Sequence, residues 1–426
     1  MRLVCGPSGF EFSIFQGDLE IVLFNRDASP KRGSAGAAIG DVLRRKKLIP
    51  APRALDFLSI ALSAMAADLA GHRDKSPDGW TREFDLVIAV DEPEVWNTQV
   101  PTLEKLLQFL TTDRWRLMFV PGAKYPKQPA KLIRPEHDSV VLVSGGLDSF
   151  AGALDLAAQK YCPLAVSQSV RGDAKKQRSL TAIVGANVGH LQLNHNTKVP
   201  APENPPSQRG RSVAFFAHGL LGATALQRYA EGETVTLYIC ENGFISINPP
   251  LTGLRLGSLS TRTSHPVVLA LLQQILDAVG LRVRLENPYA YSTKGEMLVD
   301  ALRPEDLKKY AHTTTSCGRF KRFGYRHCGR CVPCLIRRAS FHSWAVPDQT
   351  EYVFANLGID DKEHARSDDV RAVAMAVAEA ADAGFDEWLG VALSSPLIGD
   401  RGAPLRDVVE RGLKELEVFL QTFKVQ

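Results

Sequence analysis

The chain has 426 residues, enough for two or more domains, and 45% of them are hydrophobic, which suffices for ordinary cores. Its net charge of +4 is only mildly basic and neither requires nor excludes a nucleic-acid partner. The first residues lack the basic and apolar regions of a secretory signal, and no apolar run is long enough to span a membrane, so we expect a cytoplasmic protein without membrane contact.

Residues 1–120 are predicted to form an accessory N-terminal α/β domain. Its expected strands lie at 10–15, 20–24, 85–90 and 115–120, and its expected helices at 55–69 and 102–110. The domain carries no catalytic constellation, so we assign it to packing or partner binding. The proline- and lysine-rich residues 121–137 are interpreted as a linker.

The strongest motif joins an apolar, β-branched run at 140–143 to Ser-Gly-Gly-Leu-Asp-Ser at 144–149. The run predicts a buried parallel strand, and the apolar spacing after residue 149 predicts a helix. Glycines let the backbone approach a bulky anion, and the first N–H groups of a helix point at it, so the turn is a candidate phosphate cradle. The motif lacks the lysine of a Walker loop and the third glycine of a dinucleotide fingerprint. The alternative is a tight glycine turn in an α/β fold.

A second strand is expected at 164–168, beside the first in a doubly wound parallel sheet. Ligands of such sheets lie outside the carboxyl ends of the strands, so Ser167 and Gln168 would share a crevice with the glycine turn. Arg211 precedes an expected helix at 213–229, where it could neutralise phosphate charge or be an ordinary surface arginine.

Further candidate residues follow the later strands. Glu241 and Asn242 leave the carboxyl end of an expected strand at 234–240, where they could bind a donor-bearing substrate edge. Thr263 and His265 precede an apolar helix at 267–279, and we weigh helix capping and substrate contact equally for His265. Residues 293–296, Thr-Lys-Gly-Glu, have capping-box spacing. Because the helix dipole disfavours a cation in the first turn, Lys294 needs an anionic partner and is a candidate phosphate ligand.

Four cysteines spaced by ten, two and two residues can converge on one tetrahedral ion: Cys317, Cys328, Cys331 and Cys334. Adjacent glycines suit knuckle turns, and no open ligand position is evident, so we predict a structural zinc site; an iron–sulfur cluster is the alternative. Residues 346–426 are expected to be helical. The apolar stripe of the last helix, from Leu405 to Phe419, is either core or a surface for a dimer or another partner.

In combination, the glycine motif, Arg211, residues 293–296 and the four cysteines followed by Arg337 and Arg338 resemble the QueC family of 7-cyano-7-deazaguanine synthases. This family lies within the adenine-nucleotide α-hydrolase superfamily, whose pyrophosphate loop (PP-loop) splits ATP into AMP and pyrophosphate. The resemblance covers roughly residues 138–345. With its extra N-terminal unit, the chain looks most similar to QatC, the QueC-like component of the Qat anti-phage defence system.

The resemblance implies a Rossmann-like PP-loop fold that uses ATP, Mg²⁺ and Zn²⁺. The implied catalytic residues are Asp148, Ser149, Arg211 and Lys294, with Asp148 also orienting Mg²⁺. The implied ATP-binding residues are Ser144, Gly145, Gly146, Leu147, Asp148, Ser149, Ser167 and Gln168. The candidate substrate-binding residues are Glu241, Asn242, Thr263 and His265.

The implied reaction is a ligase reaction on 7-carboxy-7-deazaguanine or a related 7-deazapurine carboxylic acid. ATP adenylates the carboxylate, pyrophosphate leaves, and a C–N bond forms with ammonia or with a protein amine from the same defence system. Two other functions stay open: a PP-loop enzyme that modifies tRNA by thiolation, and a nucleotide-binding scaffold without turnover. Of the macromolecular partners, tRNA is not expected and a second copy of the chain is possible.

Overall fold

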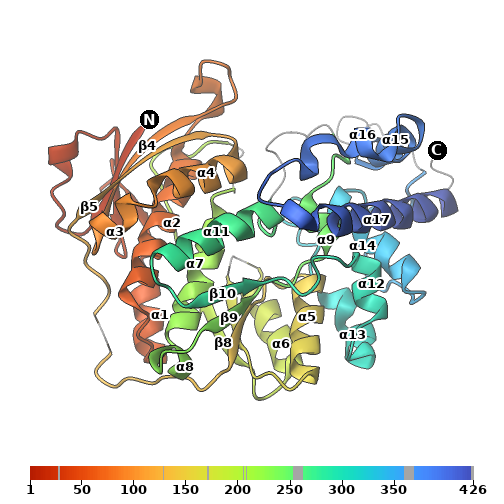
Figure 1. Ribbon diagram of the computed structural model, residues 1–426, viewed down its shortest axis with the longest axis horizontal. Coiled ribbons are helices and arrows are strands. Elements are labelled where there is room, and N and C mark those ends of the chain that lie inside the picture. Colours follow the sequence, from red (N-terminus) through yellow and green to blue (C-terminus); the bar gives the residue numbers. More distant parts are fainter. Residues whose placement is uncertain are drawn as a thin grey trace.

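The computed structural model describes residues 1–26, 29–127, 129–169, 172–204, 206–207, 209–252, 262–358 and 369–423. The chain is an α/β protein, as predicted, with two five-stranded parallel sheets surrounded by helices (Figure 1). The strand orders are β3-β2-β1-β4-β5 and β10-β9-β6-β7-β8. Both sheets therefore have the order of a doubly wound sheet, in which the chain starts at the centre, builds one side and then returns to build the other.

The first sheet occupies the N-terminal part of the chain. Its strands are β1 (Arg2–Pro7), β2 (Leu19–Leu23), β3 (Gly33–Ala35), β4 (Glu83–Val90) and β5 (Arg114–Pro121). Its helices are α1 (Ile39–Lys46), α2 (Pro52–Ala70), α3 (Pro93–Asn97) and α4 (Val100–Thr111), with 3₁₀ turns η1 (Phe12–Phe15) and η2 (Arg73–Lys75).

The strand predicted at 10–15 is wrong. The central strand is β1, which ends at Pro7, and the chain then turns through Gly9 at a φ of 86°. The turn is closed by the Phe10 N–H, which donates to the Pro7 carbonyl over 3.1 Å. Within the stretch 10–15, Phe12–Phe15 form η1, and Phe12 packs on Val4 at one face of the sheet. Hydrophobic residues at this position therefore cover a sheet and do not extend it.

The second sheet contains the predicted phosphate motif. Its strands are β6 (Ser139–Leu142), β7 (Leu164–Gln168), β8 (Gly189–Leu193), β9 (Val235–Tyr238) and β10 (Val283–Glu286). Its helices are α5 (Leu147–Ala158), α6 (Ala174–Val184), α7 (Arg211–Thr224), α8 (Gln227–Ala230), α9 (Gly243–Ile247), α11 (Pro266–Ala278), α12 (Lys294–Val299), α13 (Pro304–Tyr310) and α14 (Val332–Ser343), with the 3₁₀ turn η3 (Ala311–Thr313).

Both faces of this second sheet are covered by helices. Val140 of β6 packs into the core that contains Phe216 of α7, whereas its neighbour Val141 packs with Phe150 of α5. Successive side chains of a strand point to opposite faces, so the unbroken apolar run of β6 serves both cores. This confirms the prediction of a doubly wound parallel sheet.

The helix predicted at 213–229 is interrupted. It ends as α7 at Thr224, and Leu226 has the extended backbone that precedes α8. The Thr224 hydroxyl donates to the Leu220 carbonyl over 2.8 Å and accepts the Ala51 N–H, so it ties the end of α7 to the residue that precedes α2.

Helices α2 and α7 pack against each other between the two sheets. At their crossing, a side chain on Gly210 would lie 3.2 Å from the Cα of Met65, so the two segments approach to backbone distance. One hydrophobic core runs from Phe57 of α2 through Phe216 of α7 into the second sheet. The two sheets are thus joined by shared packing.

The C-terminal region is helical, as predicted. It contains α15 (Asp369–Asp382), α16 (Phe385–Leu389), η4 (Gly390–Leu393), η5 (Gly399–Arg401) and α17 (Gly402–Thr422). The apolar stripe of α17 is buried within the chain, where it packs on α9 and α14 (Figure 1). Among the residues described, we find no helix whose length and apolar character would let it traverse a bilayer.

His218 of α7 is fully buried, and neither of its ring nitrogens has a hydrogen-bond partner among the described residues. Burial lowers the pKa of His218 to about 3. Between pH 6.5 and pH 3, His218 is therefore protonated in the unfolded chain and neutral in the native chain. The free energy of unfolding falls as the pH falls through this range.

We expect this one histidine to cost about 2 kcal/mol of unfolding free energy between pH 7 and pH 5. His218→Leu removes the titrating group and should reduce the loss by that amount in urea denaturation at the two pH values. An unchanged pH dependence would contradict the assignment of acid sensitivity to His218.

Candidate active site

The predicted phosphate motif forms a closed turn between β6 and α5. Gly145 has a φ of 90°, a conformation that favours glycine, and Gly146 is the residue that precedes the first turn of α5. The Ser144 hydroxyl accepts the Gly146 N–H over 3.2 Å and lies 3.1 Å from the Ser149 hydroxyl. The turn is therefore fixed by its own serines, and the first N–H groups of α5 have no acceptor within the helix.

A cavity of about 380 Å³ opens at the carboxyl edge of the second sheet, beside this turn. Most of the predicted site residues line it. They are Ser144, Gly146, Leu147, Asp148, Ser149, Gln168, Arg211, Glu241, Thr263 and Lys294. The structure thus brings together residues from six separate segments of the chain at the edge where doubly wound sheets bind ligands.

Asp148 is the centre of a buried polar cluster. Its Oδ1 lies 2.6 Å from the Lys294 ammonium, and the two side chains are only 8% and 5% exposed. Its Oδ2 accepts the Asn242 side-chain amide over 2.6 Å. The side-chain oxygen of Asn242 (Oδ1) in turn caps α9 by accepting the Ile245 N–H over 3.0 Å. Both oxygens of the carboxylate are therefore held, each from a different helix N-terminus.

The capping box predicted at 293–296 is present. The Thr293 hydroxyl accepts the Glu296 N–H over 3.1 Å, and the Glu296 carboxylate accepts the Thr293 N–H over 2.8 Å. Lys294 is the first residue of α12, and the anionic partner that its position requires is Asp148. The Lys294 ammonium thus lies at the edge of the turn at 144–149 (the phosphate turn below), where the Asp148 carboxylate balances its charge.

Arg211 begins α7, as expected, and lines the cavity. Burial lowers the pKa of its guanidinium, and the carboxylate of Asp173 opposes this shift. The next residue, Ser212, shares a hydrogen bond of 2.6 Å with the Thr263 hydroxyl. The arginine is thus a partly desolvated cation at the cavity wall, where its charge acts more strongly than it would in water.

Glu241 is the second carboxylate of the cavity. Burial, reinforced by the negative charge of Asp148, raises the pKa of Glu241. Its Oε2 accepts the Ser264 hydroxyl over 2.8 Å. Its other oxygen has no hydrogen-bond partner in the described parts of the chain, so it can accept a bond from an N–H group placed in the cavity.

Four predicted site residues act from outside the cavity lining. Gly145 shapes the turn, and Asn242 acts through Asp148. The Ser167 hydroxyl donates to the Val143 carbonyl over 2.6 Å, so it joins two strands. His265 caps α11 by accepting the Val267 N–H over 3.2 Å, and its ring packs on Phe109. Of the two roles expected for His265, helix capping and substrate contact, the structure shows helix capping.

The sequence did not point to the segment that completes the cavity. Thr315, Ser316, Gly318 and Pro333, which flank the cysteine motif, line the cavity wall. The Thr315 N–H donates to the Gly145 carbonyl over 2.9 Å. The segment that leads into the cysteine motif thus contacts the glycine turn at 144–149 directly. No pattern in the sequence near Thr315 indicates this contact.

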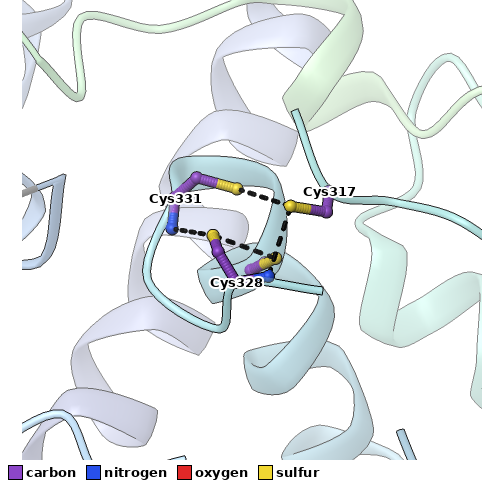
Figure 2. A group of neighbouring side chains, drawn as sticks. Cys317, Cys328 and Cys331 are labelled. Carbon is purple, nitrogen blue, oxygen red and sulfur yellow. Dashed lines mark hydrogen bonds between the residues drawn. The ribbon is translucent and has the colours of Figure 1, made fainter. Parts of the chain in front are cut away.

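The four predicted cysteines form one buried cluster, three of whose members are labelled in Figure 2. All four sulfur atoms lie within 4.8 Å of one another, and two of the pairs, Cys331 with Cys317 and Cys328 with Cys334, are 3.8 and 3.9 Å apart. A tetrahedral zinc site with bonds of about 2.3 Å requires sulfur separations of about 3.8 Å.

The surrounding backbone also suits a thiolate site. The Cys317 sulfur accepts the N–H groups of Arg319 and Cys328 over 3.3 Å each, and the Cys328 sulfur accepts the Cys331 N–H over 3.3 Å. Such donors stabilise negative sulfur ligands around a metal. The cluster can therefore hold a metal ion such as Zn²⁺. With four protein ligands the ion would be structural, since no position is left for a substrate.

Comparison with known proteins gives relatives for about half of the chain. The chain is 25% identical over 238 residues to a 7-cyano-7-deazaguanine synthase of Paracoccus denitrificans. The alignment covers 51% of this chain and 94% of the relative. It is 27% identical over 242 residues to the 7-cyano-7-deazaguanine synthase of Agrobacterium fabrum, with 50% and 91% covered. No family model and no solved structure matches the chain. About half of this chain is thus similar to nearly the full length of enzymes named 7-cyano-7-deazaguanine synthase.

Proposed function

We propose that this protein uses ATP to adenylate 7-carboxy-7-deazaguanine, or a related 7-deazapurine carboxylic acid, and then joins the acyl group to an amine. The observation that carries the proposal is the cavity in which the phosphate turn, Arg211 and the Asp148–Lys294 pair converge. The similarity to enzymes named 7-cyano-7-deazaguanine synthase supports the choice of substrate class.

In the proposed first step, a substrate carboxylate oxygen bonds to the α-phosphorus of ATP. The bond from that phosphorus to the bridging oxygen breaks, and pyrophosphate leaves. The N–H groups of the turn at 144–147 and the Ser149 hydroxyl, which lie at the N-terminus of α5 beside the cavity, would bind the departing phosphates in this step. Arg211 and Lys294 stabilise the negative charge that develops. Mg²⁺ would be held by Asp148 and would offset the charge of the triphosphate.

The substrate ring is assigned to the wall formed by Glu241 and Thr263. Glu241 offers an oxygen to a ring or exocyclic N–H group, and a purine-like ring with an amino group presents such donors. In the second step, the amine nitrogen bonds to the acyl carbon and loses one proton to solvent, and AMP leaves with the electrons of the acyl–oxygen bond.

We assign the amine to ammonia or to a protein partner in an antiviral defence system. The relatives match only about half of this chain, and the additional half supports a task beyond that of a free-standing synthase. A protein acceptor would need a docking surface, for which the N-terminal sheet is the natural candidate. A second copy of the chain is a further proposed partner.

The test is pyrophosphate release from MgATP with and without 7-carboxy-7-deazaguanine. We expect release that requires the acid and yields AMP in equal amount. The matched control substrate is 7-deazaguanine, which has the same ring and no carboxylate, and it should give no release. Release independent of the acid, or none with ammonia and the partner proteins present, would contradict the proposal.

A further inference from the structure

The two groups that hold Asp148 sit at the start of two very short helices. Lys294 is the first residue of α12, which has six residues, and Asn242 caps α9, which has five. Helices of this length are unstable by themselves, because nucleation fixes several residues for few hydrogen bonds. The placement of both Asp148 partners must therefore come from the surface on which α9 and α12 pack.

Part of that surface is α17, which contacts both α9 and α12, while α12 also packs on α14. On the α12 side, the Glu415 carboxylate accepts the Thr293 hydroxyl and, over 3.4 Å, the Gly295 N–H. A side chain on Gly295 would lie 2.4 Å from the Glu415 Oε1, so this contact requires glycine. One turn earlier in α17, the Arg411 guanidinium lies 2.6 Å from the Glu296 carboxylate of the capping box.

On the α9 side, α17 approaches just as closely. A side chain on Gly412 would lie 2.5 Å from the ring of Phe244, and one on Gly243 would lie 3.0 Å from Val408. Figure 1 shows α17 running across α9 at one end of the molecule, with α14 and α12 beside it. Helix α17 thus contacts both of the segments that carry Lys294 and Asn242, and α14 completes the support of α12.

We propose that Glu415 is a positioning residue for Lys294. By accepting two donors at the first turn of α12, it keeps the Lys294 ammonium against Asp148 at the edge of the phosphate turn. The consequence for catalysis rests on the proposed function, whereas the consequence for the placement of Lys294 does not.

The chemistry of Glu415 makes this role testable with an isosteric change. A carboxylate accepts at both oxygens, and both oxygens are used. The amide of Glu415→Gln has one acceptor and one N–H₂ group, so one of the two donors loses its partner. A hydrogen bond to a charged group contributes about 1.5 to 3 kcal/mol, which corresponds to a change of roughly tenfold or more in the population of the held state.

The experiment is lysine acetylation of the full chain, read out by mass spectrometry at Lys294 without ligands. Lys294 is 4% exposed and should react slowly in the native protein. We expect Glu415→Gln to raise its rate of labelling about tenfold. The matched control is Glu410→Gln, on the same helix, where the carboxylate pairs with Arg406 at the exposed surface. This control should leave Lys294 labelling unchanged.

A second variant guards against an uninformative loss of folding. Gly295→Ala places a Cβ 2.4 Å from the Glu415 Oε1 and 2.9 Å from the Ser343 Cβ, so it disturbs the same contact and should raise Lys294 labelling in the same way. Unchanged labelling in folded Glu415→Gln would overturn the inference. An equal increase in Glu410→Gln would also overturn it, because it would indicate general loosening of α17.

Pyrophosphate release separates this inference from the proposed function. If both hold, Glu415→Gln lowers kcat about tenfold and changes KM for ATP little, since Lys294 acts on developing charge. If the wild-type chain releases no pyrophosphate but Glu415→Gln exposes Lys294, the proposed reaction fails and the positioning role stands. A loss of kcat without increased labelling would assign Glu415 another role and overturn the inference.

Discussion

Asp148→Asn is expected to lower the rate of pyrophosphate release by about 100- to 1,000-fold, the size of effect that follows loss of one preorganised charge-stabilising group. The asparagine keeps an acceptor for Asn242 but removes the charge that holds the Lys294 ammonium at 2.6 Å. It also removes the carboxylate proposed to hold Mg²⁺. Initial rates at saturating ATP and 7-carboxy-7-deazaguanine measure this effect.

The same substitution is expected to lower the free energy of unfolding by about 3 to 5 kcal/mol, because it leaves a buried ammonium without its counter-charge. Combining it with Lys294→Met removes both charges, and the double variant should recover most of the stability and none of the activity. Urea denaturation of Asp148→Asn, Lys294→Met and the double variant measures the free energies of unfolding of this double-mutant cycle. Wild-type activity in Asp148→Asn would contradict the role assigned to the carboxylate.

Cys334→Ser is expected to abolish metal binding at the cysteine cluster and to abolish the proposed activity. A structural zinc site contributes about 10 to 16 kcal/mol of binding free energy in small peptides, so loss of one ligand should lower the melting temperature strongly. Activity should be lost as well, because Gly318 and Pro333 beside the cysteine cluster line the cavity. Elemental analysis should find one zinc per wild-type chain and less in the variant.

The matched control is Cys162→Ser, since Cys162 is partly exposed and lies outside the cysteine cluster. It should retain the metal content and the melting temperature of the wild-type chain. Iron with acid-labile sulfide in place of zinc would support the iron–sulfur alternative. Full metal content together with an unchanged melting temperature in Cys334→Ser would argue against a four-cysteine site.

The parts of the site that could be predicted are those encoded within one continuous stretch of the chain, the four-cysteine motif at 317–334 included. The strand and glycine turn at 140–149 and the capping box at 293–296 each use local backbone chemistry, and both are present. The need of Lys294 for an anion also followed from its place in a first turn. The identity of that anion, Asp148, did not follow, because the pairing depends on how the sheet folds.

The features that could not be predicted depend on contacts between distant segments. The approach of Thr315 to the phosphate turn is made by one backbone hydrogen bond to Gly145 and leaves no periodic pattern. The apolar residues at 10–15 fit a strand and a covering turn equally well, and Gly9 with its left-handed backbone decides for the turn. For His265, capping and substrate contact use the same residue type, and only burial beside Phe109 separates them.

The close crossing of α2 and α7 has a consequence for the modularity of the protein. A chain shortened to begin at residue 138 would present the α2-facing side of α7 to water, where Gly210 and its neighbours now meet the backbone of the N-terminal unit. The two halves are therefore interdependent in folding, and a catalytic fragment cut out at the expected linker would tend to aggregate. Any exchange of N-terminal units between such proteins would have to preserve the matching helix surface.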